Sequence, residues 1–469
     1  MSARGFVKAS LGALVLGGAV AALATAVTCR RCARSGRDGG VLVATRIHLP
    51  EAAAASFRLD GVERALAARR VPVRVLTTRP PADVEHADGE AQGVRVSRWP
   101  ALRDSSGYLR GYVPYLSFDL PLALRLLLAP RPGVVLVEPP PTTGAVVRVV
   151  AALRGVPYVW YAPDVWSTAT LSTGAPEAVA RTVRALEAFA VRGAARVIAV
   201  NDEVARAVSG LARGGAARSD AAPRSVRRES VRVVPNGVDT TVFDVFGPRP
   251  DPRERSGMGL TGPYFVYAGT ASEWQGAEVF VHALEQVRRT RPGVQLLFLG
   301  QGSAWHEVER EASRLPAGSD GAPAVVMHPL VPAAEAARWQ RAAVAALVSI
   351  RPGQGYDFAY PTKVLSALGC GTPVLYAGRG PVVADIRDFD LGWVAEHEPA
   401  AVARAMRAAL DAHGTGSAER AAAQRLHDWV EDHRSLRATG ESVGRILHEV
   451  AAGAARVGGP HPIHEGRQW

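Results

Sequence analysis

Short apolar runs alternate with amphipathic segments along most of the chain, and this alternation predicts the fold. VLVATRIHLP (Val41–Pro50) begins as a buried strand and ends in loop residues. Ser56–Arg69 has the apolar spacing of a helix, and VPVRVLTT (Val71–Thr78) predicts the next strand. Continuous apolar strands that alternate with helices are typical of a parallel sheet with helices on both faces. We therefore expect the chain to open with a strand–helix–strand unit.

The alternation continues in two successive series. The first series is predicted to have further strands at Val134–Glu138, Tyr158–Ala162 and Arg196–Val200. The second is predicted to begin with VRVVPN and to contain YFVYAGT (Tyr264–Thr270), QLLFLGQG (Gln295–Gly302), VVMHPL, AALVSI and TPVLYAG, with helices at Ala277–Arg289 and Glu335–Ala343. Between them, Arg213–Ser230 is rich in Gly, Ala and Arg and lacks periodicity, which predicts a surface loop.

These patterns predict an α/β protein with two doubly wound parallel-sheet domains. A chain of 469 residues is too long for one ordinary core. We assign residues 38–225 to a first domain, 229–410 to a second, 411–452 to C-terminal helices and 453–469 to a flexible tail. Ligands of such sheets bind at the carboxyl ends of the strands, so we expect the site in a cleft that both domains face.

Residues 1–37 predict a membrane anchor with a basic flank. Leu11–Val27 is an almost unbroken run of small apolar residues, close to the length of about 17–25 that crosses a bilayer. Arg4 and Lys8 precede the run, and four arginines follow it: Arg30, Arg31, Arg34 and Arg37. By the positive-inside tendency, this predicts a single-pass protein of the cell membrane whose body is cytoplasmic. A cleaved secretory signal, cut near Ala24 and Ala26, is the alternative.

The composition indicates a folded protein with anionic partners. Hydrophobic residues make up 48% of the chain, charged residues 21%, and the formal net charge is +11. A basic surface favours lipid headgroups, phosphates or nucleic acid, but no RNA-binding aromatic motif accompanies the charge, which argues against nucleic acid. The three cysteines, Cys29, Cys32 and Cys370, are too few for a disulfide framework and indicate a reducing compartment.

Lysine is almost absent from this arginine-rich chain. Only Lys8 and Lys363 occur among the 55 Lys and Arg residues. Lys363 lies in FAYPTKVLSALGCGTPVLYAG, where the pattern predicts a helix start with Thr362 as a possible cap. A lysine at the positive end of a helix dipole is unfavourable unless an anion binds there, which predicts a phosphate contact. A surface lysine without a role is the alternative.

Four motifs together resemble those of the group 1 (family 4) glycosyltransferases. VRVVPNGVDTTVF (Val231–Phe243) resembles the N-G-V-D-x-x-x-F motif of that family. YAGTASEWQGAEVFVHAL, LLFLGQGS and PTKVLSALGCGTPVL follow in the order and spacing of the family. The resemblance covers most of residues 40–410. PEAAAASFRL and EPPPTTGAVVRVV in the first half look like bacterial members that build surface polysaccharides or glycolipids.

The resemblance implies a GT-B fold with the acceptor on the first Rossmann-like domain and a nucleotide-sugar on the second. It also implies transfer with retention of anomeric configuration. Phosphate binding at strand-end glycines and helix N-termini agrees with this placement. Lys363 is then the candidate catalytic residue at the donor diphosphate, and the implied donor-binding residues are Asn236, Gly237, Gly269, Thr270, Gln275, Gly276, Gly300, Gly302, Thr362 and Ser366.

The chain departs from the family at the helix that carries Lys363. Family members have a Glu-x7-Glu pattern here, whereas this chain has Phe358 and Ser366 at the two positions. Pro361-Thr362-Lys363 is similar to the Pro-Ser/Thr-Lys variant of some members. The missing carboxylates leave two alternatives open: a catalytically degenerate GT-B glycan-binding or scaffold protein, and a sugar-nucleotide epimerase of the same fold.

The first domain has candidate residues near the carboxyl ends of its predicted strands. Asp164 follows a strand at a position where the resembled family often has Asp or His near the acceptor, although a loop cap is the alternative. Glu138 also ends a strand and is a second candidate catalytic carboxylate. Ser56 and Arg58 follow the first strand as acceptor-side candidates, where alanines replace the family's Gly-rich loop.

We expect sugar transfer by this protein to require no cofactor and no divalent metal. Asp388-Phe389-Asp390 resembles the Asp-x-Asp metal pair of the other glycosyltransferase fold, GT-A, but it precedes LGWVAE, which we predict to be a loop. The expected function is sugar transfer from a nucleotide-sugar to a lipid-linked or glycan acceptor. The expected setting is cell-envelope polysaccharide or glycolipid synthesis at the membrane.

Overall fold

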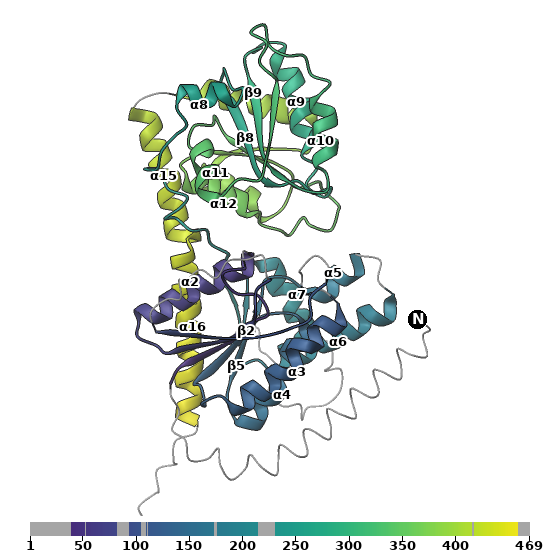
Figure 1. The fold of residues 1–469 in the computed structure, drawn as a ribbon, viewed down its shortest axis with the longest axis vertical. Coiled ribbons are helices and arrows are strands. Elements are labelled where there is room, and N and C mark those ends of the chain that lie inside the picture. Colours follow the sequence, from purple (N-terminus) through teal and green to yellow (C-terminus); the bar gives the residue numbers. More distant parts are fainter. Residues whose placement is uncertain are drawn as a thin grey trace, which may run out of the picture. The chain divides into compact units, whose positions relative to one another are not determined.

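The computed structural model describes residues 39–51, 53–81, 93–104, 109, 111–172, 176–213, 230–414 and 417–457 (Figure 1). These residues form two compact units. The first unit contains the described residues up to Val234 and those from Gly440 onward, and the second contains Pro235–Thr439. Each unit is built on one parallel sheet, which confirms the predicted two-domain α/β class.

No helix in the described ranges is long and apolar enough to cross a membrane. The predicted anchor, Leu11–Val27, lies outside those ranges, as does most of the predicted loop Arg213–Ser230. Both therefore stay predictions from sequence.

The first unit has a seven-stranded parallel sheet in the order β3-β2-β1-β4-β5-β6-β7. The strand order reverses between β1 and β4, which is the switch point of a doubly wound fold. The edge strand β3 was not predicted, because two arginines and a serine interrupt its apolar residues. The strands are β1 (Val41–Ala44), β2 (Val73–Thr78), β3 (Val94–Trp99), β4 (Val134–Val137), β5 (Tyr158–Ala162), β6 (Arg196–Ala199) and β7 (Val231–Val233).

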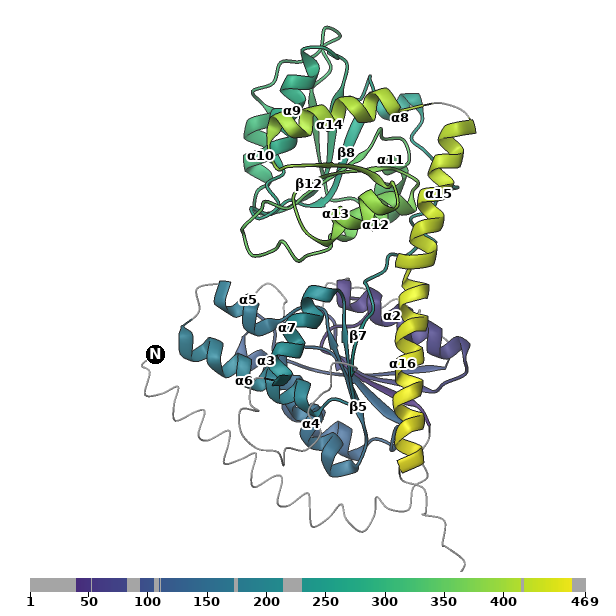
Figure 2. The ribbon, with the colours of Figure 1, turned by 180° about the vertical axis from the view of Figure 1, so that it is seen from behind.

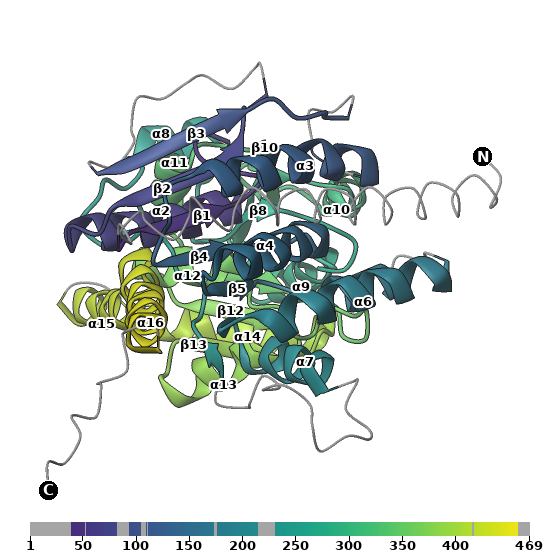
Figure 3. The same ribbon diagram turned by 90° about the horizontal axis from the view of Figure 1, so that it is seen from below.

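Helices cover both faces of this sheet, because successive residues of each strand point to opposite faces. Leu42 and Trp160 face α3, α4, α6 and α7, whereas Val43 and Tyr161 face α2 and α16. Figure 3 shows α3, α4 and α6 on one side of the sheet and α16 on the other. The helices of this unit are α2 (Ala54–Ala68), α3 (Tyr112–Leu128), α4 (Pro141–Arg154), α5 (Trp166–Ser172), α6 (Glu177–Gly193), α7 (Asp202–Arg213) and most of α16 (Leu436–Val457).

The second unit has a six-stranded parallel sheet in the order β10-β9-β8-β11-β12-β13. Its strand order reverses between β8 and β11. The strands are β8 (Tyr264–Thr270), β9 (Gln295–Gln301), β10 (Val325–Pro329), β11 (Ala346–Ser349), β12 (Val374–Ala377) and β13 (Gly392–Ala395).

The second sheet is also covered on both faces. Tyr267 and Phe298 face α9, α10 and α14, whereas Val266 and Leu299 face α11, α12, α13 and α15. Helices α9 and α14 pack side by side (Figure 2). The helices are α8 (Pro252–Gly257), α9 (Glu278–Arg288), α10 (Trp305–Ala312), α11 (Ala333–Gln340), α12 (Thr362–Gly369), α13 (Pro381–Asp388), α14 (Pro399–Ala412) and α15 (Ser417–Arg434).

The boundary between the units corrects the predicted start of the second domain at residue 229. VRVVPN does not begin the second series, because β7 pairs with β6 in the first sheet. The Val234 amide continues this pairing and donates to the Ala199 carbonyl over 2.8 Å. A short apolar strand carries no mark of the sheet that it joins, so sequence pattern placed it on the wrong side of the boundary.

Residues 411–452 were assigned to a separate segment of C-terminal helices. The structure instead divides these helices between the two units. Helix α15 packs in the second unit, whereas α16 packs on α2 in the first. The contact is close at Gly440, where an added Cβ would lie 2.1 Å from the Gly61 carbonyl oxygen. Helix α16 also continues to Val457, so the first residues of the predicted tail (453–457) are helical.

The predicted loop after Asp388-Phe389-Asp390 is a strand. LGWVAE contains β13, the edge strand of the second sheet, which pairs with β12. Asp388 ends α13, and Asp390 has a left-handed backbone (φ 51) in the turn before β13. The pattern was missed because the strand has only four residues and begins with glycine, which is depleted in strands.

The close approach at Gly440 makes a testable prediction for the packing of α16. Gly440→Ala should lower the free energy of unfolding of the first unit by about 1–3 kcal/mol, because the new methyl group meets backbone that cannot move aside. Gly453→Ala is the matched control on the same helix, since nothing lies within 4 Å of its added Cβ. Thermal unfolding should show a loss for the first variant and no loss for the second. Equal melting temperatures would contradict the packing.

Candidate functional site

The carboxyl ends of β8, β9 and β11 gather most of the predicted donor-binding residues of the second unit. Thr270 ends β8 beside the switch point with β11. Helix α12 follows β11 along the chain and begins at Thr362. Lys363, in its first turn, reaches back to the end of β8. The topology therefore brings Lys363 and Thr270 together across the switch point, as expected for a ligand site in this fold.

The Lys363 amine is held by two oxygen atoms. It donates to the Tyr267 hydroxyl over 2.7 Å and to the Thr270 carbonyl. The Tyr267 hydroxyl in turn donates to the same carbonyl over 3.0 Å. No carboxylate forms an ion pair with Lys363 among the described residues. The two acceptors hold the amine in place, but no described carboxylate neutralises its charge.

The surroundings of Lys363 make its charge unfavourable in the absence of a ligand. Burial lowers the pKa of Lys363 to about 7. The first amides of α12 point out of the helix without intrahelical acceptors, and they add positive potential at the same place. Burial raises the pKa of Tyr267, so its hydroxyl stays protonated. The arrangement favours an anion that would accept from the amine and the helix N-terminus.

Close backbone packing explains why glycine occupies these positions at the ends of β8 and β9. An added Cβ on Gly300 would lie 2.0 Å from the Gly269 carbonyl oxygen, and one on Gly302 would lie 2.1 Å from that of Ala271. An added Cβ on Gly269 would lie 3.0 Å from Cε of Lys363. Gly269 and Gly302 have φ values of 113° and 144°. The glycines therefore allow the two loops to pack together and make room for Lys363.

Gln275 and Gly276 shape the loop that precedes α9. The Gln275 side-chain oxygen accepts from the Ser272 amide over 2.9 Å, so this buried side chain holds the loop. Gly276 has φ 62, and His397 lies over its backbone with Nε2 at 3.0 Å from its carbonyl oxygen. Gln275 and Gly276 therefore shape the loop before α9, and direct ligand contact by either residue stays a prediction.

Four further predicted donor residues lie near the start of the second unit and in α12. An added Cβ on Gly237 would lie 2.4 Å from the Ser435 carbonyl oxygen, so a close backbone approach explains this glycine, and Asn236 lies half-buried beside it. Thr362 is the first residue of α12 and not its cap, because Pro361 occupies the capping position without a side-chain hydrogen bond. The Ser366 hydroxyl donates to the Lys363 carbonyl over 3.0 Å within the helix.

In the first unit, Arg58 and Glu138 form a buried ion pair. Arg58 Nη2 lies 2.5 Å and Nε 3.1 Å from Glu138 Oε1, and the two side chains are 6% and 4% exposed. Arg58 projects from α2, and Glu138 directly follows β4. Each charge is compensated by the other, so the pair fixes α2 against the carboxyl end of the sheet. The predicted catalytic role of Glu138 and acceptor contact of Arg58 are not supported by this pairing and stay predictions.

Asp164 is the first-unit candidate with unused hydrogen-bonding capacity. Its Oδ1 atom is buried and has no hydrogen-bond partner among the described residues, and the same holds for the Ser56 hydroxyl. Burial raises the pKa of Asp164 to about 6, and the nearby Glu187 carboxylate adds to this shift. A carboxyl group that titrates near neutral pH at a strand end can exchange a proton with a ligand hydroxyl.

Sequence reasoning missed other polar residues at the same strand ends. Arg46 follows β1, and its guanidinium carbon lies 4.3 Å from the ring centre of Tyr115. Asp119 on α3 accepts from the Thr143 hydroxyl over 2.6 Å, and burial raises the pKa of Asp119 to about 6. The position of Arg46 directly after a strand was a signal that could have found it. Asp119 lies mid-helix and gave no such signal.

The second unit also has missed candidates beside the loop before α9. Trp274 and Tyr356 stack with ring centres 4.5 Å apart. Arg351, which follows β11, forms an ion pair with Glu278 at the start of α9. In the described part of the chain, no group of three His, Cys, Asp or Glu side chains is placed to hold a metal ion.

Comparison with known families agrees with the two units. A model described as "Glycosyl transferase 4-like domain" matches residues 54–237, and one described as "Glycosyl transferases group 1" matches residues 262–412. A D-inositol 3-phosphate glycosyltransferase of Acidothermus cellulolyticus is 31% identical over 189 residues, which are 39% of this chain and 41% of the relative. One from Xylanimonas cellulosilytica is 30% identical over 237 residues, 46% and 55% of the two chains. The chain spans about half the length of the curated relatives it matches.

Solved structures share the fold at low identity. HepE from Anabaena in complex with UDP has a TM-score of 0.60 and 15% identity, covering 87% of this chain and 100% of its own. The trehalose 6-phosphate synthase of Burkholderia multivorans has a TM-score of 0.64 and 16% identity, covering 92% and 100%. The two parallel-sheet units therefore have the GT-B type of Rossmann-like domain.

The isolated lysine allows a direct test of its environment. We expect one of the two lysine Cε resonances in ¹³C-lysine-labelled protein to titrate near pH 7, because burial disfavours the charged amine. The unfolded state then binds more protons than the folded state between about pH 7 and 10. The contribution of Lys363 to stability should therefore become more favourable as pH rises through this range. Lys363→Arg should remove the low-pH transition, and two titrations above pH 10 would contradict the placement.

The Arg58–Glu138 pair predicts a large stability effect. Glu138→Ala should lower the free energy of unfolding by about 3–5 kcal/mol, because it leaves an uncompensated buried guanidinium. Arg58→Met/Glu138→Leu should recover most of this loss, since it removes both charges and keeps the volume. Denaturant unfolding of the variants measures both effects. A fully stable Glu138→Ala protein would argue for a free, catalytic Glu138.

Proposed function

Because the chain belongs to the group 1 glycosyltransferases, we propose that it transfers a sugar from a nucleotide-sugar donor to a hydroxyl acceptor with retention of configuration. The donor binds at the carboxyl end of the second sheet, and the acceptor at that of the first. The nucleotide-sugar agrees with the structural neighbours, which were solved with UDP and UDP-glucose.

The observation that carries the proposal is the uncompensated Lys363 amine at the start of α12. Its hydrogen bonds to Tyr267 and the Thr270 carbonyl fix its position at the switch point. The free amides at the start of α12 and the amine of Lys363 in its first turn both supply positive potential, which suits a diphosphate. An anion there would also remove the unfavourable effect of burial on the charged amine.

This site assists the chemistry by stabilising the leaving group. When the bond between the sugar and the diphosphate breaks, negative charge develops on the diphosphate oxygen. A fixed cation and fixed dipoles stabilise this charge more in the transition state than in the ground state. The diphosphate oxygen released in this way can accept the proton of the acceptor hydroxyl on the same face of the sugar.

Asp164 is the proposed acceptor-side residue of the first unit. Its orphaned Oδ1 atom can accept from an acceptor hydroxyl or a sugar hydroxyl. The pKa of about 6 leaves it mostly ionised at neutral pH, so that it acts as an acceptor of hydrogen bonds. The Arg58–Glu138 pair lies beside it and fixes the electrostatic environment.

We assign the acceptor to the lipid-linked or glycan class and the protein to the cell membrane with a cytoplasmic body. The apolar run Leu11–Val27 and the arginines that follow it support this setting. The relatives are named for D-inositol 3-phosphate, which is therefore the soluble acceptor to compare with lipid-linked glycans.

The test combines donor binding with turnover. Thermal shifts with UDP-, GDP-, ADP- and dTDP-sugars should single out one base class, because a ligand of the native state raises the melting temperature. Lys363→Ala should abolish the shift and lower kcat/KM by about 10²–10³. Arg404→Ala, which removes an exposed cation on α14, should leave both unchanged. Lys363→Arg should fall between these, since a planar guanidinium does not replace the compact amine.

The substitutions at Phe358 and Ser366 define the outcomes that would overturn the proposal. Donor binding without turnover on any acceptor would identify a degenerate glycan-binding or scaffold protein. Conversion of the donor without acceptor would identify an epimerase. No shift with any donor would refute the diphosphate site itself.

A further inference from the structure

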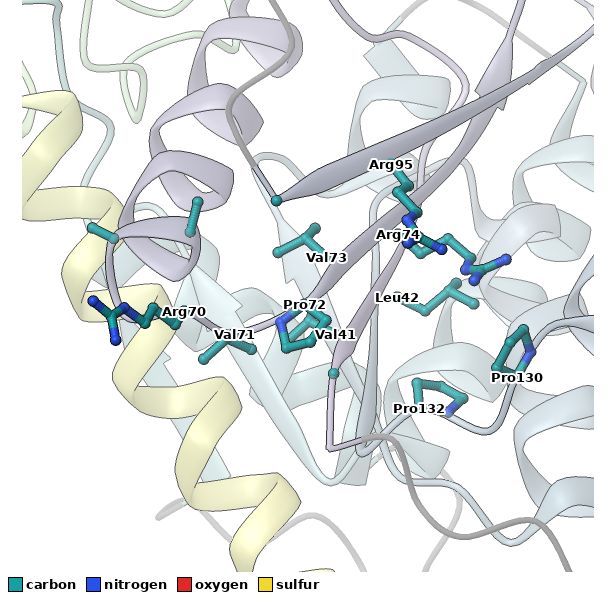
Figure 4. Close-up of a pocket in the computed structure, with 14 residues that line it drawn as sticks. Val41, Leu42, Arg70, Val71, Pro72, Val73, Arg74, Arg95, Pro130 and Pro132 are labelled. Atoms are coloured by element: carbon teal, nitrogen blue, oxygen red, sulfur yellow. The ribbon is translucent and has the colours of Figure 1, made fainter.

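A cavity lies at the amino ends of the strands of the first sheet, opposite to their carboxyl ends. It has a volume of about 810 Å³ and is lined by the amino ends of β1, β2 and β3, the end of α2 and the segment that follows α3 (Figure 4). None of the residues of the proposed transferase site lines it. Three of its lining residues are arginines: Arg70, Arg74 and Arg95.

Two of these arginines lie directly beside each other. Arg74 on β2 pairs in register with Arg95 on β3, and Leu42 on β1 pairs with Arg74. In-register neighbours of a parallel sheet project from the same face, so the two guanidinium groups share one surface, as Figure 4 shows. Like charges directly opposite each other destabilise a sheet. Arg95 is exposed and Arg74 half-buried, so the repulsion is modest, and an anion between the two groups would turn it into attraction.

No side chain of the described residues supplies that charge. The lining contains neither Asp nor Glu, and neither Arg74 nor Arg95 forms an ion pair with any described carboxylate. Arg103 in the same unit, by contrast, forms an ion pair with Glu51 over 2.8 Å. The third lining arginine, Arg70, adds positive charge at the far end of the cavity and has a left-handed backbone (φ 58).

The rest of the lining is apolar. Val41, Leu42, Val71, Pro130 and Pro132 form its walls below the arginines. A small inorganic anion would leave most of this surface empty. An amphiphile with a phosphate group would place its charge at Arg74 and Arg95 and its glycerol and upper acyl carbons against the apolar wall.

The position of the cavity along the chain agrees with a membrane ligand. Gly40 lines it, and the predicted anchor ends at Val27. The intervening residues 28–39 span at most about 40 Å when extended, which keeps the cavity within reach of the bilayer surface. Arginines 30, 31, 34 and 37 in this segment are also suited to an anionic surface.

We propose that the cavity at the amino ends of β1, β2 and β3 binds the phosphate headgroup of an anionic membrane phospholipid through Arg74 and Arg95. The site is separate from sugar transfer. It holds the first unit at the membrane surface through the amino ends of β1, β2 and β3.

The test uses the full chain in an uncharged maltoside detergent. The probes are dihexanoyl phosphatidylglycerol, dihexanoyl phosphatidylcholine and inorganic phosphate, with melting temperature and hydrogen exchange of residues 71–75 and 94–97 as readouts. Phosphatidylglycerol should protect these residues, and phosphatidylcholine should not. Arg74→Gln/Arg95→Gln should weaken phosphatidylglycerol binding by about tenfold or more. Arg181→Gln/Arg206→Gln, which removes the same charge from the exposed surfaces of α6 and α7, should not.

Charge reversal separates loss of binding from loss of folding. Arg74→Glu creates an opposite-charge pair with Arg95, so it should raise the melting temperature of the lipid-free protein while it abolishes binding. The proposal is overturned if both phospholipids bind equally or if the double glutamine variant binds like the wild type. Inorganic phosphate that binds as tightly as phosphatidylglycerol would overturn the lipid assignment in favour of a soluble phosphate ligand.

Discussion

The Lys363 amine donates to a tyrosine hydroxyl and a carbonyl oxygen of β8, with no described carboxylate to neutralise it, and this contact constrains the loops at the switch point of the second sheet. Gly269 must lack a side chain so that the lysine chain can pass. Gly300 and Gly302 must lack one so that the loop after β9 can close against the loop after β8. The glycines of these motifs are thus needed for close packing of the two loops, whether or not a ligand is bound.

Some buried charged groups of the protein are paired with each other and others are not. The paired groups stabilise the fold, whereas the unpaired ones are available to a ligand. Arg58 and Glu138 neutralise each other in the first unit, so their removal as a pair changes little. Lys363 and Asp164 lack such partners: one has its pKa lowered and the other has it raised by burial. Groups whose charge is left uncompensated at a strand end are the ones that a substrate can compensate.

The first sheet has polar side chains at both the carboxyl and the amino ends of its strands. Its carboxyl edge carries Asp164 and Arg46 at strand ends, where doubly wound folds bind their ligands. Its amino edge carries Arg74 beside Arg95 over an apolar cavity, which the fold alone does not require. The arginine on the edge strand β3 discourages pairing with a further strand, and together with Arg74 on β2 it is suited to an anion.

The sequence by itself determined the fold class, the two-domain division and most strands, because continuous apolar runs between helical segments leave few other folds. It also singled out Lys363 and the glycine motifs, whose residue types are unusual enough to be seen without coordinates. Only the tertiary structure decided that β7 belongs to the first sheet and that α16 packs on the first unit, since a strand or helix carries no mark of its partner. Only the structure paired Glu138 with Arg58 and Arg74 with Arg95, because such contacts join residues far apart in sequence and depend on register and side-chain direction.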